Sequence, residues 1–215
     1  QCAKTKDVEL INENTDTTSN IYYGFVLNEV LYDPPSGLEG DSNNDSVRDP
    51  NDDEFVEFVN DTDSIFDLSG YKIYDAERLA LGTPNHEFPE NTLINPGQAV
   101  VVFGGGTPTG SFGGADVIAT ADYGSLGLNN AGDKLTVKDK DGNIIIEFEW
   151  GGSTIYDGGS DQSLTRDPDL LGDFVLHTTT VAGGTYSPGT QADGSAFDVG
   201  LNDPTKVQFK VSEFT

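Results

Sequence analysis

One short stretch of the sequence gathers the residue types that bind a hard cation. Between positions 41 and 54, oxygen-bearing side chains recur at places 1, 3, 5, 9 and 12 of a loop counted from Asp41. Calcium takes roughly six to eight oxygen ligands, so a loop wound round the ion presents them at alternate places, with a backbone carbonyl at the seventh. The spacing predicts a calcium site whose ligands are Asp41, Asn43, Asp45, Val47 (through its carbonyl), Asp49, Asp52, Asp53 and Glu54.

The details of the stretch favour calcium over other ions. Asp52 fills the twelfth place, but the sixth place, usually glycine in such loops, is Ser46, so the sharp turn must be made differently. Magnesium prefers its own waters in strict octahedral geometry. Zinc lacks ligands, since the chain holds only His86 and His177 and no nearby thiol. The alternative is a solvated acidic loop, in which this many carboxylates would repel one another.

Two further acids precede the loop. Glu29 and Asp33 lie where the preceding strand is expected to enter it, and an acidic segment begins the next strand after it. If the two strands are neighbours, the loop closes over their shared end and an ion there would clamp them together. A plain hydrogen-bonding role for Glu29 is the alternative.

The charge of the chain limits its partners. Its 37 acidic and 11 basic residues give a formal net charge of −26. Such a charge repels phosphate backbones and anionic lipid head groups, which argues against nucleic acid as a partner and against direct membrane insertion. Divalent cations are favoured instead, because they neutralise carboxylates that would otherwise repel each other in a compact fold.

Other features of the sequence suggest a secreted protein, extracellular or at the cell surface. There is no methionine, and the first residue is Gln1, which would suit cleavage by a signal peptidase. No apolar run approaches the roughly 18 residues that span a bilayer. Cys2 is the only cysteine, so an intrachain disulfide is impossible. It is a leftover thiol, a lipid anchor or half of an intermolecular disulfide, and Gln1 before it argues against the lipid.

The distribution of glycine, proline and β-forming residues predicts an all-β protein. Short runs rich in Val, Ile, Phe and Tyr alternate with turn residues, a pattern typical of a sandwich or barrel, and no segment predicts a helix. The residues from 140 to 143 predict a tight primed hairpin turn in which the aspartates are turn formers. Strands are expected at 23–32, 54–60, 71–75, 98–104, 134–139, 143–150 and 206–214.

The two ends of the chain differ from its middle. Residues 1–22 are mostly polar and are predicted to form an N-terminal arm, followed by one sandwich over 23–197. The C-terminal extension, 198–215, contains the most regular alternation in the sequence, with Val207, Phe209 and Val211 on one face. That predicted strand needs a sheet edge with which to pair.

A series of motifs occurs in fixed order along the chain, at 25–30, 53–60, 67–71, 93–98, 128–133, 163–166, 174–178 and 186–189. In this order they resemble the lamin-tail domain as it occurs in secreted bacterial proteins. The resemblance spans about residues 24 to 197, and it implies an immunoglobulin-like β sandwich that is usually a non-enzymatic accessory, anchoring or interaction module. The Asp-rich loop in turn resembles the calcium loops of dockerins.

No residue pattern indicates catalysis. Neither histidine lies within a nucleophile elbow, and the glycines at 104–106 are not followed by the Lys-Ser/Thr of a phosphate loop. Two functions remain. The first is an extracellular structural protein that assembles with copies of itself into an oligomer or filament by pairing its terminal strands. The alternative is a monomeric, surface-displayed adhesion module that recognises carbohydrate or protein through Tyr22, Tyr23, Tyr123 and Tyr156.

Overall fold

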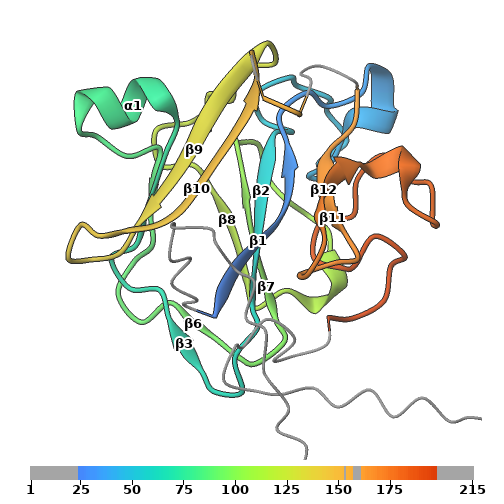
Figure 1. Ribbon diagram of the computed structural model, residues 1–215. Coiled ribbons are helices and arrows are strands. Elements are labelled where there is room, and N and C mark those ends of the chain that lie inside the picture. The colour runs from blue at the N-terminus through green and yellow to red at the C-terminus, as the bar shows by residue number, and fades with distance from the viewer. Residues whose placement is uncertain (1–23, 153, 157–160, 198–215) are drawn as a thin grey trace, which may run out of the picture.

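The protein folds as two facing β sheets with the core between them (Figure 1). The computed structural model describes residues 24–152, 154–156 and 161–197. The predicted arm at 1–22, Tyr23, and the predicted extension at 198–215 with its strand at 206–214 lie outside the described residues. Within the described part, the all-β immunoglobulin-like architecture predicted from the sequence is confirmed.

The larger sheet has six strands in the order β12-β11-β1-β2-β7-β8. All neighbours are antiparallel except β7 and β8, which run parallel. The expected strands at 23–32, 54–60 and 98–104 correspond to β1, β2 and β7, whereas β8, β11 and β12 were not predicted. The bounds are β1 (Phe25–Leu31), β2 (Phe55–Asn60), β7 (Ala99–Phe103), β8 (Val117–Thr120), β11 (Leu164–Asp167) and β12 (Asp173–Leu176).

The smaller sheet has four strands in the order β10-β9-β4-β5, and its β9–β10 hairpin crosses in front of the larger sheet (Figure 1). A separate two-stranded ribbon pairs β3 with β6. The bounds are β3 (Phe66–Asp67), β4 (Lys72–Tyr74), β5 (His86–Glu87), β6 (Leu93–Ile94), β9 (Gly132–Lys138) and β10 (Ile144–Gly151), with 3-10 turns at Gly37–Gly40, Phe112–Gly114 and His177–Thr179.

The expectation that the chain contains no helix is wrong. α1 (Ala76–Leu81) follows β4, and the side chain of Asp75 caps its start by accepting a hydrogen bond from the backbone N–H of Arg78. Gly82 ends the helix in the left-handed conformation, with φ 71°. A helix of six residues is too short for the apolar repeat that reveals longer helices in a sequence.

Of the two aspartates predicted as turn formers between β9 and β10, Asp139 organises the turn through its side chain, but the turn is not a tight primed one. Asp139 accepts side-chain hydrogen bonds from the N–H groups of Asp141 and Asn143, at 2.9 and 2.8 Å. The N–H of Gly142 bonds to the carbonyl of Asp139, and Gly142 alone of the turn residues takes positive φ, 86°. This is a type I turn followed by a left-handed glycine, the usual three-residue hairpin connection.

Aromatic side chains join the two sheets at the centre of the core. Trp150 on β10 stacks on Tyr32, with ring centroids 4.9 Å apart, and its indole N–H donates to the carbonyl of Asn129. Phe148 packs against Phe174 of β12, with ring centroids 4.2 Å apart. Both sheets therefore meet around one aromatic cluster near the end of β1.

The outer face of the six-stranded sheet is also buried. Two apolar clusters cover it, one around Phe55 and Phe103 and the other around Val59 and Phe197. The segment from 177 to 197 supplies much of this cover. β1 and β2 are consequently buried at every position, including the polar ones.

We expect Trp150→Ala to lower the free energy of unfolding by about 3–5 kcal/mol, because it removes a fully buried aromatic ring and leaves a cavity between the sheets. Urea unfolding followed by fluorescence of the tyrosines and by circular dichroism measures the change. Val181→Ala is the control, since Val181 is fully exposed and its loss should change stability by no more than about 0.5 kcal/mol. A loss below about 1 kcal/mol for Trp150→Ala would contradict this view of the core.

Candidate functional site

The acidic loop lies at one end of the sandwich, between two neighbouring strands. β1 and β2 pair antiparallel, and the segment from 32 to 54 connects them. The prediction that the loop closes over the shared end of two adjacent strands is therefore confirmed. The backbone of the next strand fixes the end of the loop, because the N–H of Gly104 donates to the carbonyl of Glu54 at 2.8 Å.

The first half of the loop is wound around its own carboxylates. Asp41 accepts hydrogen bonds from the N–H groups of Asp45 and Ser46, at 3.1 and 2.9 Å. Asp45 in turn accepts one from the N–H of Val47 at 2.8 Å, while the Val47 side chain is exposed. Ser46 adopts φ 73°, the left-handed conformation that glycine usually provides at this place. The sharp turn is thus present despite the missing glycine.

The second half of the loop is tied to the first through Asp53. One oxygen of this buried carboxylate accepts from the N–H of Asn43 at 3.2 Å, and the other accepts from the N–H of Asp49 at 2.8 Å. Asp49 accepts from the N–H groups of Asn51 and Asp52 at 2.8 and 3.2 Å. The predicted ligands from 41 to 53 therefore belong to one connected structure.

Three consecutive glycines after β7 form a surface against which the loop packs. A Cβ atom on Gly106 would lie 2.4 Å from the Asn43 amide nitrogen and 2.6 Å from a carboxylate oxygen of Asp45. A Cβ on Gly105 would lie 2.3 Å from a carboxylate oxygen of Asp52. The side chains at the third, fifth and twelfth places of the loop therefore converge on the turn at 104–106. The sequence analysis considered these glycines only as a phosphate loop and missed this role.

The pKa values of two acids reflect their position in the loop. The pKa of Asp52 is raised by partial burial first and then by the nearby charges of Asp49 and Asp45. Burial also raises the pKa of Asp53, against the lowering effect of the N–H groups that it accepts from. These carboxylates thus repel one another in a setting where no basic side chain is among the causes of their shifts.

The loop has spare oxygen lone pairs as well as an organised backbone. A carboxylate offers about four acceptor positions, and each aspartate above uses only part of them on N–H groups. Within the described residues, no three acidic, histidine or cysteine side chains are arranged as a ready-made metal cluster. The donor set that fits calcium is accordingly a mixture of carboxylates, the Asn43 amide and backbone carbonyls.

Glu54 is separated from the other predicted ligands. Its neighbour Asp53 faces the loop, and because side chains alternate along a strand, Glu54 points to the opposite side. There it accepts a hydrogen bond from the N–H of Leu128 at 3.2 Å. Burial raises its pKa to about 8, with smaller contributions from the charges of Asp133 and Asp75.

Glu29 and Asp33 also have partners outside the loop. Asp33 accepts from the Asn130 amide at 2.6 Å and from the N–H of Asp161 at 3.2 Å. Glu29 accepts from the hydroxyl groups of Ser163 and Ser187, at 2.6 and 2.7 Å. The hydrogen-bonding role considered for Glu29 is therefore the one that the structure shows.

Glu29 belongs to a buried pair of acids on the outer face of the six-stranded sheet. It lies opposite Glu57 in the β1–β2 register, next to a bulge at Asn28, and both glutamates are completely buried. The Asn28 amide donates to Glu57 at 3.0 Å and to Asp169 at 3.1 Å. Burial is the main cause that raises the pKa of both glutamates, and the charge of Glu29 further raises the pKa of Glu57.

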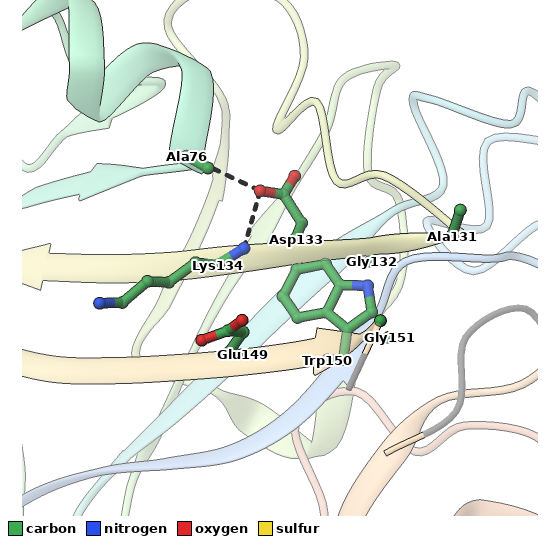
Figure 2. Close-up of a pocket in the computed structure, with 9 residues that line it drawn as sticks. Ala76, Ala131, Gly132, Asp133, Lys134, Glu149, Trp150 and Gly151 are labelled. Carbon is green, nitrogen blue, oxygen red and sulfur yellow. Dashed lines mark hydrogen bonds between the residues drawn. The ribbon is translucent and has the colours of Figure 1, made fainter. Parts of the chain in front are cut away.

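A hollow of about 340 Å³ lies beside the start of β9 (Figure 2). Asp133, at the edge of the hollow, accepts hydrogen bonds from the backbone N–H groups of Ala76 and Lys134, at 3.1 and 2.7 Å. The bond from Ala76 holds the start of α1 against the sheet. Trp150 is buried and cannot offer its face to a ligand. The hollow is lined by Ala76, Ala131, Gly132, Asp133, Lys134, Glu149, Trp150, Gly151 and Gly152, which include no pair of nucleophile and base.

A comparison of the sequence with known families agrees with the β-sandwich fold. The family model of the lamin tail domain matches residues 24–152, which is more than half of the chain. The chain belongs to the lamin tail domain family. A comparison with curated proteins gives no match. In the described residues, no helix has the length and apolar character needed to cross a bilayer.

The buried glutamate pair predicts a pH dependence of stability. A glutamate whose pKa is raised in the folded state contributes stability below its unfolded pKa, near 4.5, and loses that contribution as pH rises through the folded pKa. Glu57→Gln cannot ionise, so we expect the variant to gain stability relative to the unmodified protein between pH 5 and pH 8. Urea unfolding at a series of pH values measures this difference.

Asp139→Asn is the matched control, because the pKa of Asp139 is lowered, mainly by its hydrogen bond with the Asn143 side chain. Its contribution should be constant from pH 5 to pH 8 and fall only in stronger acid. A stability difference for Glu57→Gln that stays flat over this range would show that Glu57 does not resist ionisation in the folded protein.

Proposed function

We propose that this lamin-tail protein is a non-catalytic, extracellular structural protein that binds calcium at the β1–β2 loop and assembles with copies of itself. One observation carries the calcium proposal: side chains of Asn43, Asp45 and Asp52 converge on the glycine turn at 104–106. They come from the third, fifth and twelfth places of the loop. An ion there would join the loop to the segment after β7.

The electrostatics of the loop support this proposal. After partial burial, the nearby charges of Asp49 and Asp45 raise the pKa of Asp52, so negative charge in this part of the loop is uncompensated. A divalent cation removes such repulsion more effectively than N–H groups do, because it carries a full opposite charge. Extracellular modules often bind calcium weakly, with dissociation constants of roughly 0.1–1 mM, and a loop without a ready-made cluster suits that range.

The geometry around both histidines supports a non-catalytic role. His177 lies 3.0 Å from the hydroxyl of Ser187, whose other neighbour is the carboxylate of Glu29 at 2.7 Å. In a catalytic triad the histidine stands between the serine and the acid, whereas here the serine is in the middle. His86 is buried against the ring of Phe88, and burial is the main cause that lowers its pKa.

Self-assembly is supported by the pattern of the predicted strand at 206–214. A strand left over after a complete sandwich pairs with a free sheet edge of another molecule, and main-chain hydrogen bonds provide the affinity. Donor and acceptor would be different surfaces, so the contact repeats from copy to copy and produces a filament.

One observation favours the alternative, a monomeric module that binds carbohydrate or protein. Tyr123 is 62% exposed, and the guanidinium of Arg78 lies 3.6 Å from its ring centroid. Tyr156, by contrast, packs against Phe148 and Phe174 in the core. Within residues 24–152, 154–156 and 161–197, Tyr123 is the single exposed tyrosine, which is a small surface for carbohydrate and is why assembly is our first proposal.

We expect Asp45→Asn and Asp52→Asn each to weaken calcium binding about tenfold or more, which corresponds to about 1.4 kcal/mol of binding free energy. Isothermal titration calorimetry at constant ionic strength measures the affinity. Asp141→Asn is the control, because it removes the same charge from the exposed β9–β10 turn. Equal weakening by all three substitutions would mean that calcium only screens the overall charge.

Assembly predicts that the full chain forms oligomers whose size grows with protein concentration. Light scattering coupled to size exclusion should detect them, and removal of residues 206–215 should leave a folded monomer. Removal of residues 1–21 tests the arm separately. A full chain that stays monomeric at high concentration would favour the alternative function.

A further inference from the structure

β10 is a long strand at the edge of its sheet. It has eight residues and pairs with β9 on one side, and no strand of the described ranges pairs with its other side. The other edge strands of the two sheets are shorter: β12 and β8 have four residues each and β5 has two. β10 thus presents the longest row of available backbone donors and acceptors among these edges.

The sequence of β10 gives its edge only part of the usual protection. It begins with three consecutive isoleucines, and Ile144 is 48% exposed. Natural edge strands are commonly protected by lysine, proline, a short length, other charged side chains or a β-bulge. β10 has no lysine or proline and is not short, although it carries Glu147, Glu149 and a register shift between Ile144 and Ile146. A long edge with an exposed apolar start is typical of a surface that another strand covers.

The two faces of β10 differ in chemistry. Ile146, Phe148 and Trp150 face the core between the sheets. Glu147 and Glu149 alternate with them on the other face, where both are exposed. Figure 2 shows Glu149 on β10 beside Lys134 on the neighbouring β9. A strand added at this edge would therefore need apolar residues on one face and basic residues on the other.

The predicted strand at 206–214 has that composition. Val207, Phe209 and Val211 alternate with a second face that contains Lys206 and Lys210. Two of the 11 basic residues of the chain thus occur on one face of one nine-residue segment. In a protein with a net charge of −26, this concentration of positive charge complements the acidic face of β10.

The place where the described chain ends favours a second molecule as the source of this strand. Phe197 packs with Val26 and Val59 on the outer face of the six-stranded sheet, opposite the face that meets the smaller sheet. The eight residues from 198 to 205 span at most roughly 28 Å. To pair with its own β10, the segment would have to pass from the outer face of the six-stranded sheet round its edge to the smaller sheet, whereas a neighbouring copy can present β10 directly.

We propose that the free edge of β10 receives residues 206–214 of a second copy of the chain as an added strand. Lys206 and Lys210 then lie on the face of Glu147 and Glu149, and the apolar face of the segment extends the core of the acceptor. This assignment rests on the proposed self-assembly and identifies its acceptor surface. Each copy both donates and accepts, so the contact propagates.

Charge exchange tests the pairing in the full chain. We expect Glu149→Lys, and separately the double substitution Lys206→Glu with Lys210→Glu, to raise the concentration needed for assembly about tenfold. Combining them should restore assembly at least in part. Glu149 is chosen because Glu147 already pairs with Lys134. Glu90→Lys, an equal charge change at an exposed turn, is the control and should leave assembly unchanged, as sedimentation velocity can measure.

A peptide of residues 204–215, added to the chain that lacks 206–215, identifies the edge directly. Hydrogen exchange followed by mass spectrometry should show slower exchange at 144–151. Slower exchange at β8, β12 or β5 instead, with assembly that still requires 206–215, would overturn the β10 assignment and leave the proposed self-assembly standing. Absence of both peptide binding and assembly would overturn both, and a monomer whose own tail protects β10 would overturn the pairing between copies.

Discussion

The need to accommodate negative charge governs much of this structure. With 37 acidic and 11 basic residues, ion pairs cannot neutralise most of the carboxylates. The protein stabilises them in two observable ways. Half-buried aspartates in turns and in the acidic loop accept hydrogen bonds from backbone N–H groups, as at Asp139 and Asp41. Buried glutamates such as Glu29 and Glu57 have pKa values raised mainly by burial, so their charged form is disfavoured.

The two proposals extend this principle to the remaining charge. Calcium at the β1–β2 loop would neutralise acids that N–H groups satisfy only in part, and it would link the loop to the glycines after β7. At the free edge of β10, lysines supplied by a second copy would face exposed glutamates. Calcium ions and the lysines of a second copy would thus neutralise part of the negative charge on the surface of the sandwich.

The sequence predicted the sandwich because its central strands are short runs rich in valine and phenylalanine between turn residues, as in β1, β2 and β7. It did not reveal β3, β5 and β6, which have two residues each, or the six-residue α1. The spacing of the loop predicted which acids lie together. Because side chains alternate along a strand, the sequence could also have separated Glu54 from Asp53. The role of the glycines at 104–106 and the burial of Glu57 depend on contacts between distant segments, which spacing alone does not contain.

Thermal unfolding as a function of free calcium is the most direct test of this account. A site present only in the folded state stabilises it by RT ln(1 + [Ca²⁺]/Kd), about 2.7 kcal/mol at a hundredfold excess over Kd. We predict that the melting temperature rises with calcium and falls back with a chelator, and that sodium at equal ionic strength has a much smaller effect. A melting temperature that calcium and sodium change equally, or that neither changes, would contradict it.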